Sequence, residues 1–215
     1  MPRDTAALDL ETLVMAYAAG VFPMAENRDD PEVFWVDPRE RGILPLDGFR
    51  LSRSLARTIL RARFAVTLDR DFAGVLAGCA DRPETWINRP LAELYGQLHA
   101  AGIARSVEVW EEGALVGGVY GVGLGGAFFG ESMFSRRPDA SKVALAYAVA
   151  LLRRGGFTLF DTQFPTRHLA SLGGETIPRA LYRRRLRAAL ERRGVLAGPI
   201  PPPADVVAIC RAAPA

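Results

Sequence analysis

Apolar positions along the chain alternate between helical and strand-like spacing. Apolar residues spaced at three and four predict helices over residues 9–20, 51–64, 71–80, 90–102, 139–156 and 177–194. Short apolar or alternating segments predict strands over residues 64–72, 106–111, 114–124, 126–134 and 157–164. A proline-rich tail follows the last predicted helix. The three central strands follow one another with only short turns between them, which predicts an antiparallel meander.

This order of elements predicts an α+β fold with a mostly antiparallel sheet. The first helix is followed by an irregular stretch with four prolines, so we expect a small N-terminal domain over residues 1–49. A larger domain should cover residues 50–215. A meander followed by a helix and a strand is also the order that a coenzyme A-dependent N-acetyltransferase would show.

Three glycines in the meander have the spacing G-x-G-x-x-G, at Gly121, Gly123 and Gly126. In dinucleotide-binding proteins such a loop follows a strand and opens a helix. Here the following segment, "AFFGESMFS", has the character of a second strand. We therefore expect a hairpin turn with close backbone approach instead of a dinucleotide site.

Composition limits the protein class and the chemistry. Of 215 residues, 49% are hydrophobic and 24% are charged, as in ordinary globular proteins. No apolar run reaches the length of a membrane span and no apolar signal core is present near the start, so we expect a cytoplasmic protein with no membrane association. Cys79 and Cys210 have no Cys or His at ligand spacing and the chain has only two histidines, so we expect no metal site.

The basic residues are almost all arginine, and the net charge is +3. Arg53, Arg57 and Arg61 follow one another at intervals of four, so they share one face of the predicted helix. A solvated face and a surface that tracks nucleic-acid phosphates both agree with this spacing.

Several polar and aromatic residues stand where their type is unusual. Glu131 lies in an otherwise apolar, aromatic strand, and buried acids are rare unless paired. Asp161 and Gln163 are two apart in a strand, so they should point to one face. Trp35 and Trp86 lie in polar loops, where an indole ring can stack on a base. These residues are the candidates for binding and chemistry.

Segments spread over the chain resemble the leucyl/phenylalanyl-tRNA–protein transferase family. The resemblance runs from about Tyr17 to Leu190, and its most specific strings are "GESMFS", and "DTQF" followed by "HLASLG". It implies a small N-terminal domain and an N-acetyltransferase-like C-terminal domain. It also implies transfer of leucine or phenylalanine, and less readily methionine, from aminoacyl-tRNA to proteins that begin with Arg or Lys. The product would carry an N-terminus that marks it for degradation, and the reaction would need no cofactor and no metal.

The resemblance also suggests a role for each candidate. Gln163 would contact the reacting amine, Asp161 would polarise Gln163, and Glu131 would pair with the cationic acceptor side chain. The tryptophans would hold the 3′-terminal adenosine, and the three helix arginines would meet tRNA phosphates. An apolar pocket for the transferred side chain would be formed by Val119, Met133, Leu145, Ala148, Leu152 and Phe160.

The chain departs from the family pattern at several positions. Arg105 replaces the usual His, "FPW" becomes "FPM" ending at Met24, and Thr176 replaces a Glu. The usual Trp-x-Ser-Pro is Trp35-Val36-Asp37-Pro38. Two alternatives stay open from the sequence: a coenzyme A-dependent N-acetyltransferase, and a non-catalytic tRNA-binding module. We expect a monomer.

Overall fold

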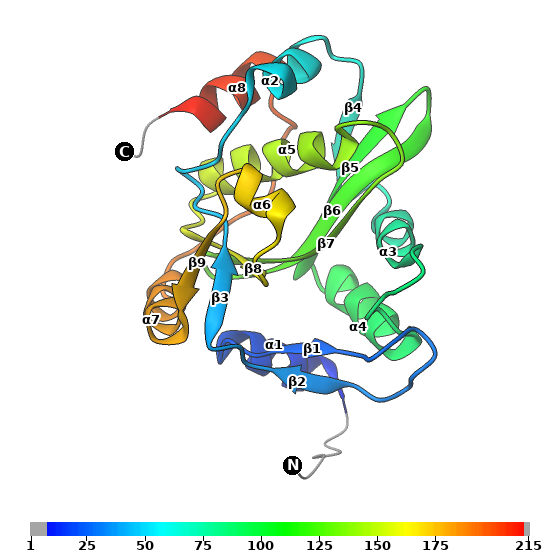
Figure 1. The fold of residues 1–215 in the computed structure, drawn as a ribbon, viewed down its shortest axis with the longest axis vertical. Coiled ribbons are helices and arrows are strands. Elements are labelled where there is room, and N and C mark those ends of the chain that lie inside the picture. The colour runs from blue at the N-terminus through cyan, green and yellow to red at the C-terminus, as the bar shows by residue number, and fades with distance from the viewer. Residues whose placement is uncertain (1–7, 213–215) are drawn as a thin grey trace.

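A seven-stranded sheet forms the centre of the protein, as the computed structural model shows for residues 8–212 (Figure 1). Its strand order is β4-β5-β6-β7-β8-β3-β9. The strands are β3 (Glu40–Ile43), β4 (Ala65–Leu68), β5 (Ala104–Glu111), β6 (Ala114–Leu124), β7 (Ala127–Ser135), β8 (Leu159–Gln163) and β9 (Glu175–Pro178). Among these, β7 and β8 pair in parallel and the other neighbours pair antiparallel. The predicted α+β class with a mostly antiparallel sheet is confirmed.

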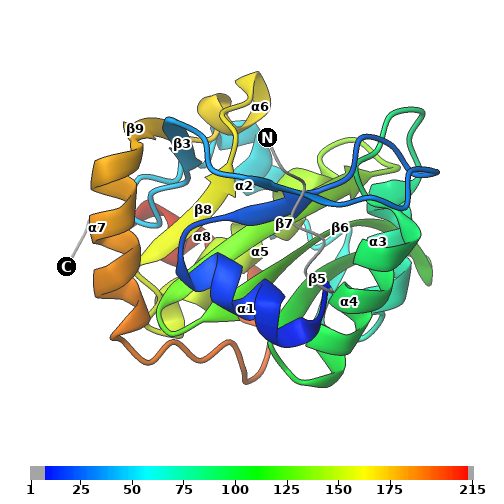
Figure 2. The same ribbon diagram turned by 90° about the horizontal axis from the view of Figure 1, so that it is seen from below.

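Helices cover both faces of the sheet (Figures 1 and 2). One apolar cluster joins the sheet to α2 (Arg53–Leu60), α5 (Ala140–Arg154) and α8 (Pro203–Arg211). The other joins it to α1 (Leu10–Ala18), α3 (Phe72–Ala80), α4 (Arg89–Ala100) and α7 (Arg179–Leu190). A short helix, α6 (Arg167–Ser171), follows β8. Among the helices of this described part, none is long and apolar enough to cross a membrane.

The glycine-rich stretch forms the predicted hairpin. β6 and β7 pair antiparallel and turn at Gly125 and Gly126, and Gly125 has a positive φ of 55°. Gly121 lies inside β6, at a register shift, where an added Cβ would come within 2.3 Å of the carbonyl oxygen of Phe129. This glycine is therefore required for close strand approach, and no helix opens after the motif.

The N-terminal segment forms a small separate ribbon and also one strand of the main sheet. β1 (Phe22–Met24) and β2 (Phe34–Val36) form a separate two-stranded ribbon. β3, which follows at once, lies in the main sheet between β8 and β9. The chain is thus part of the main sheet from Glu40 onward, and a domain boundary after residue 49 stays a prediction.

The proline-rich tail contains a helix that the sequence pattern did not indicate. α8 begins with Pro203 in its first turn, where a missing N–H costs nothing. Its Val206, Val207 and Cys210 are buried in the cluster that contains α5. The tail therefore completes the core beside α5.

Candidate active site

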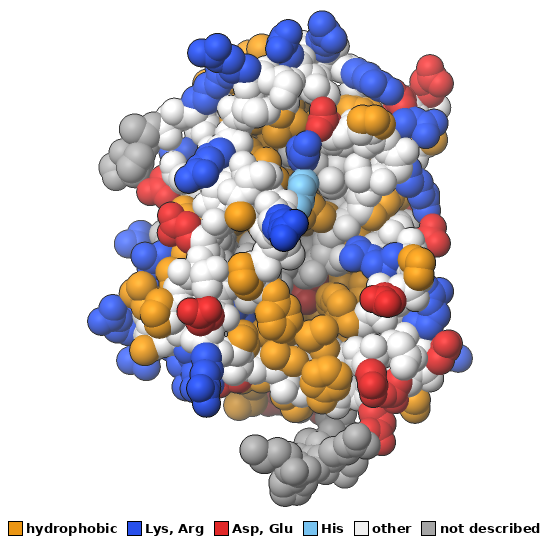
Figure 3. Space-filling view, viewed as in Figure 1, with side chains coloured by type: hydrophobic (Ala, Val, Ile, Leu, Met, Phe, Trp, Pro, Cys, Tyr) orange, Lys and Arg blue, Asp and Glu red, His pale blue; other side chains and the backbone are white. Residues whose placement is uncertain are grey.

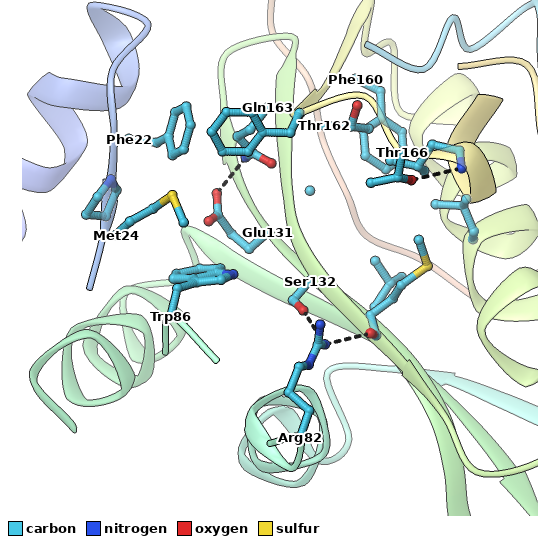
Figure 4. Close-up of a pocket in the computed structure, with 17 residues that line it drawn as sticks. Phe22, Met24, Arg82, Trp86, Glu131, Ser132, Phe160, Thr162, Gln163 and Thr166 are labelled. Carbon is cyan, nitrogen blue, oxygen red and sulfur yellow. Dashed lines mark hydrogen bonds between the residues drawn. The ribbon is translucent and has the colours of Figure 1, made fainter. Parts of the chain in front are cut away.

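A cavity opens where the parallel strands β7 and β8 separate. Their pairing ends at Phe129 and Asp161, although β7 continues to Ser135 and β8 to Gln163. The cavity has a volume of about 250 Å³ and lies in a hollow with apolar side chains around it (Figures 3 and 4). Its walls are formed by Phe22, Pro23, Met24, Arg82, Trp86, Val119, Gly130, Glu131, Ser132, Met133, Leu145, Phe160, Thr162, Gln163, Phe164, Thr166 and Leu169.

Glu131 and Gln163 face each other inside this cavity (Figure 4). The Gln163 amide nitrogen donates a hydrogen bond of 3.1 Å to Oε1 of Glu131. The hydroxyl of Tyr95 donates to Oε2 at 2.9 Å, and that hydroxyl lies 2.8 Å from the hydroxyl of Tyr17. A line of polar groups from α1 and α4 therefore holds the carboxylate in an otherwise apolar wall.

Burial raises the pKa values of Glu131 and of the two tyrosines beside it. Burial raises the pKa of the Glu131 carboxyl from about 4.5 to about 7; the Tyr17 and Tyr95 hydroxyls lower it, and the charge of Asp161 raises it further. Burial, together with the negative charge of Glu131, raises the pKa of Tyr17 and Tyr95 well above the ordinary value. Both tyrosines stay protonated at neutral pH, so they remain hydrogen-bond donors.

Asp161 lies behind the cavity wall in a buried ion pair. Its side chain is fully buried, and it accepts from Nε and Nη2 of Arg41 at 2.9 and 2.6 Å. The Tyr182 hydroxyl donates to it at 2.7 Å, and the Gln163 backbone N–H donates at 2.8 Å. Gln163 has a φ of 55°, a region that non-glycine residues seldom adopt. Asp161 therefore fixes the backbone of Gln163.

Four of the six predicted pocket residues line the cavity. Val119, Met133, Leu145 and Phe160 are wall residues. Ala148 and Leu152 are not: they are buried elsewhere in the same apolar cluster. The structure thus brings the strand residues together with Leu145 of α5, whereas Ala148 and Leu152 of the same helix lie in the core.

The two tryptophans lie in different places. Trp86 lines the cavity, and Met24 lies beside it (Figure 4). Trp35 is on β2, 36% exposed, and does not line the cavity, although its register partner Pro23 does. Met24 stands where the family pattern has a tryptophan, so a thioether and an indole form this side of the mouth.

The predicted arginine face is exposed on α2. Arg53, Arg57 and Arg61 lie on the surface, and Leu55, Ala56 and Ile59 of the same segment are buried. In Figure 1, α2 is at the end of the molecule away from the β1–β2 ribbon. These arginines do not line the cavity.

Sequence reasoning missed the residues that hold the site. Arg41 and Asp161 are 120 positions apart, and Tyr17 and Tyr95 are 78 apart, so no local pattern joins them. Arg82 was missed as well: its Nη2 donates to Oγ of Ser132 at 3.0 Å and to the carbonyl oxygen of Met133 at 3.2 Å. Among the residues that the structure describes, no three His, Cys, Asp or Glu side chains are grouped as metal ligands.

Family models and curated relatives both match this chain over most of its length. The family model described as leucyl/phenylalanyl-tRNA protein transferase matches residues 43–187, and the model of that family's N-terminal domain matches residues 6–39. A leucyl/phenylalanyl-tRNA–protein transferase of Ruegeria sp. is 63% identical over 93% of this chain and 95% of its own. One from Cereibacter sphaeroides is 64% identical over 94% of this chain and 95% of its own.

Among solved structures, that of FemX has a TM-score of 0.54 and 13% sequence identity, and covers 78% of this chain and 66% of its own. This likeness concerns the fold alone. It agrees with the predicted fold class, an α+β domain with a mostly antiparallel sheet. The matches of both family models and the identity to curated relatives over nearly the whole length show that the chain belongs to the leucyl/phenylalanyl-tRNA–protein transferase family.

Proposed function

We propose that this chain transfers leucine or phenylalanine, and less readily methionine, from aminoacyl-tRNA to the N-terminal Arg or Lys of proteins. The names of its relatives supply the donor and the kind of acceptor. The observation that carries the proposal to residues is the pair of Glu131 and Gln163 in an apolar cavity. The new N-terminal residue would mark the acceptor protein for degradation.

Glu131 supplies the recognition of the acceptor. A protein that begins with Arg or Lys brings a cationic side chain into the cavity, and a carboxylate is its natural partner. The carboxylate is held by Tyr95 and Gln163, so its direction is fixed before the acceptor arrives. In the apolar wall, a neutral acceptor side chain would leave the charge of this carboxylate without a counter-ion, which gives selectivity for cations.

Gln163 orients the reacting amine. Its amide nitrogen donates to Glu131, so its amide oxygen is left as an acceptor for an amine N–H. The neutral amine, whose conjugate acid has a pKa of about 7.7–8.0, attacks the ester carbon of the aminoacyl group. The new C–N bond forms, the C–O bond to the ribose breaks, and the proton leaving the amine is taken up by the ribose oxygen. An amide does not accept a proton at neutral pH, so Gln163 contributes orientation.

The apolar wall accepts the side chain that is transferred. We predict that Leu145→Phe lowers phenylalanine transfer about tenfold more than leucine transfer, because overfilling penalises the larger donor. The comparison is the ratio of kcat/KM for Phe-tRNA and Leu-tRNA. Ala148→Phe is the matched control: it adds bulk to the same helix outside the cavity, so it should lower stability and leave the ratio unchanged. Equal ratios in both variants would remove Leu145 from the pocket.

We propose that Trp86 and Met24 hold the 3′-terminal adenosine of the tRNA. Base–aromatic stacking contributes about 1–3 kcal/mol, so Trp86→Ala should raise KM for Leu-tRNA about tenfold or more. Met24→Ala should raise it less. The alternative is that the adenine stacks between Trp35 and Trp86, and Trp35→Ala tests it. We expect little change in KM for Leu-tRNA with Trp35→Ala. A rise in KM as large as that caused by Trp86→Ala would show that Trp35 also binds the adenosine.

The activity itself is tested by incubating the protein with Leu-tRNA and a peptide that begins with Arg, followed by mass measurement of the peptide. A parallel reaction with acetyl-CoA in place of Leu-tRNA examines the N-acetyltransferase alternative. A tRNA-binding module without catalytic activity would bind charged and uncharged tRNA equally and leave the peptide unchanged in both reactions.

We also propose that Arg53, Arg57 and Arg61 contact tRNA phosphates, in agreement with their exposure.

A further inference from the structure

The net positive charge of this protein arises from one C-terminal segment. Residues 179–193 contain seven arginines and one acid, Glu191, which gives them a net charge of +6. The whole chain has a net charge of +3, so the remainder of the chain is net negative. The positive net charge therefore depends on α7 and the few residues that follow it.

Most of these arginines are exposed and unpaired. Arg184, Arg185, Arg187, Arg192 and Arg193, which we call the α7 basic face, are all on the surface. Within residues 8–212, none of the five makes an ion pair or a side-chain hydrogen bond, unlike Arg179 and Arg183, which bind Asp37 at 2.8 Å each. Like charges three or four apart destabilise a helix. The segment thus keeps an uncompensated charge that a polyanion would neutralise.

The inner face of α7 fixes the helix to the active site. Tyr182 donates to Asp161, and Leu186 and Ala189 are buried beneath the helix. Asp37, which follows β2, receives the two ion pairs from the first turns of α7. Figure 2 shows α7 along one edge of the molecule beside β9 and β3. A ligand bound on the outer face of α7 is therefore held in a constant position relative to the cavity.

We propose that the α7 basic face binds the sugar–phosphate backbone of the donor tRNA, as a surface additional to α2. This inference rests on the proposed function, which places the 3′ end of an RNA in the cavity. The RNA backbone has a negative charge at every phosphate, and arginine binds phosphate with two parallel hydrogen bonds. α2 and α7 lie on different sides of the molecule (Figure 1), so the two surfaces contact different parts of the RNA.

The test compares two variants with the same change of charge. Arg184→Gln with Arg187→Gln removes two charges from the α7 basic face. Arg70→Gln with Arg137→Gln is the control: both arginines are exposed, Arg70 follows β4 at the opposite edge of the sheet from β9, and Arg137 pairs with Glu111 at the end of β5. For each protein, the dissociation constant of Leu-tRNA is measured from low to moderate salt, together with KM for the peptide and the melting temperature.

We expect the α7 variant to bind Leu-tRNA several-fold more weakly at low salt. The slope of log Kd against log salt should fall by about 0.7–0.9 for each phosphate that the variant no longer binds. KM for the peptide should not change and the melting temperature should not fall, since like-charge repulsion is relieved. The control variant should keep the wild-type slope. An unchanged slope in the α7 variant, or an equal change in the control, would overturn the inference.

The same experiment separates this inference from the proposed function. If wild-type protein adds leucine to the Arg-peptide and the α7 variant keeps the wild-type slope, tRNA binding by the α7 basic face is refuted and the proposed transfer activity is retained. If wild-type protein adds no leucine while the α7 variant has a smaller slope, the transfer activity is refuted and tRNA binding by the α7 basic face is retained. Binding of polyglutamate is measured in parallel. A variant with weaker polyglutamate binding and an unchanged tRNA slope would overturn the RNA assignment in favour of an acidic protein partner.

Discussion

Glu131→Gln is expected to lower kcat/KM for Arg-peptides about 30- to 100-fold and to leave Leu-tRNA binding nearly unchanged. Removal of one partner of a desolvated charge pair costs about 2–5 kcal/mol. We expect the lower part of that range because Glu131 keeps partial exposure. Glutamine keeps the shape of the side chain and can still accept from Tyr95, but its NH2 group cannot accept from the Gln163 amide. The change therefore removes the charge and one hydrogen bond.

A peptide that begins with citrulline gives the matched acceptor, since citrulline has the shape of arginine without its charge. Wild-type protein should discriminate strongly between the arginine and citrulline peptides, whereas Glu131→Gln should treat them nearly equally. If the variant transfers to the arginine peptide at the wild-type rate, Glu131 does not recognise the acceptor.

The deficit of Glu131→Gln should depend on pH. Because burial raises the pKa of Glu131 to about 7, the carboxyl is protonated and neutral below that pH. The wild-type advantage in kcat/KM should therefore be full at pH 8 and roughly tenfold smaller at pH 6. The ionisation of the acceptor amine affects both proteins equally and cancels in the ratio.

Stability provides the control for a purely structural role. The pKa of Glu131 is raised on folding, so its contribution to stability is present below about pH 4.5 and is lost as pH rises through about 7. At pH 8 the ionised carboxylate is a cost, and Glu131→Gln should melt no lower than the wild type. A marked fall in melting temperature together with loss of both substrates would indicate a structural residue.

Arg41→Met is expected to lower the free energy of unfolding by about 3–5 kcal/mol, because it leaves Asp161 charged, buried and unpaired. Transfer should also fall, since Asp161 fixes the Gln163 backbone. Tyr182→Phe removes one hydrogen bond from the same carboxylate and should cost about 1–2 kcal/mol. Chemical denaturation at neutral pH measures both.

The double variant Arg41→Met with Asp161→Leu separates stability from positioning. Replacing both ions by apolar side chains should recover at least half of the stability that Arg41→Met removes, because no unpaired charge remains. Transfer should stay low, since the Gln163 N–H then has no acceptor to hold its left-handed backbone. If transfer returned with stability, Asp161 would have no positioning role.

The sequence was sufficient where local patterns decide the structure. The apolar spacing over residues 9–20 predicts the helix α1, and in the structure Asp9 caps it by accepting from the Thr12 N–H. The hairpin of β6 and β7 followed from the glycines between two apolar segments. In both cases the interacting residues are close in the chain, so spacing carries the information.

The sequence was insufficient where burial is complete. In α5 every residue from Val143 to Leu152 is buried, so an i, i+3, i+7 stripe does not distinguish the cavity side from the core side. The spacing leaves open which of Leu145 and Ala148 faces the cavity, and in the structure only Leu145 lines it. The Arg41–Asp161 pair depends on the insertion of β3 beside β8, a long-range pairing that no local pattern contains.

If this cavity joins an amino acid from tRNA to an N-terminal arginine, an Arg-peptide incubated with Leu-tRNA gains the mass of one leucine residue. Fragmentation then places that residue on the N-terminal side of the arginine. The same peptide with an acetylated N-terminus should not change. An unmodified Arg-peptide under conditions where Leu-tRNA is bound, or leucine added to the acetylated peptide, would contradict it.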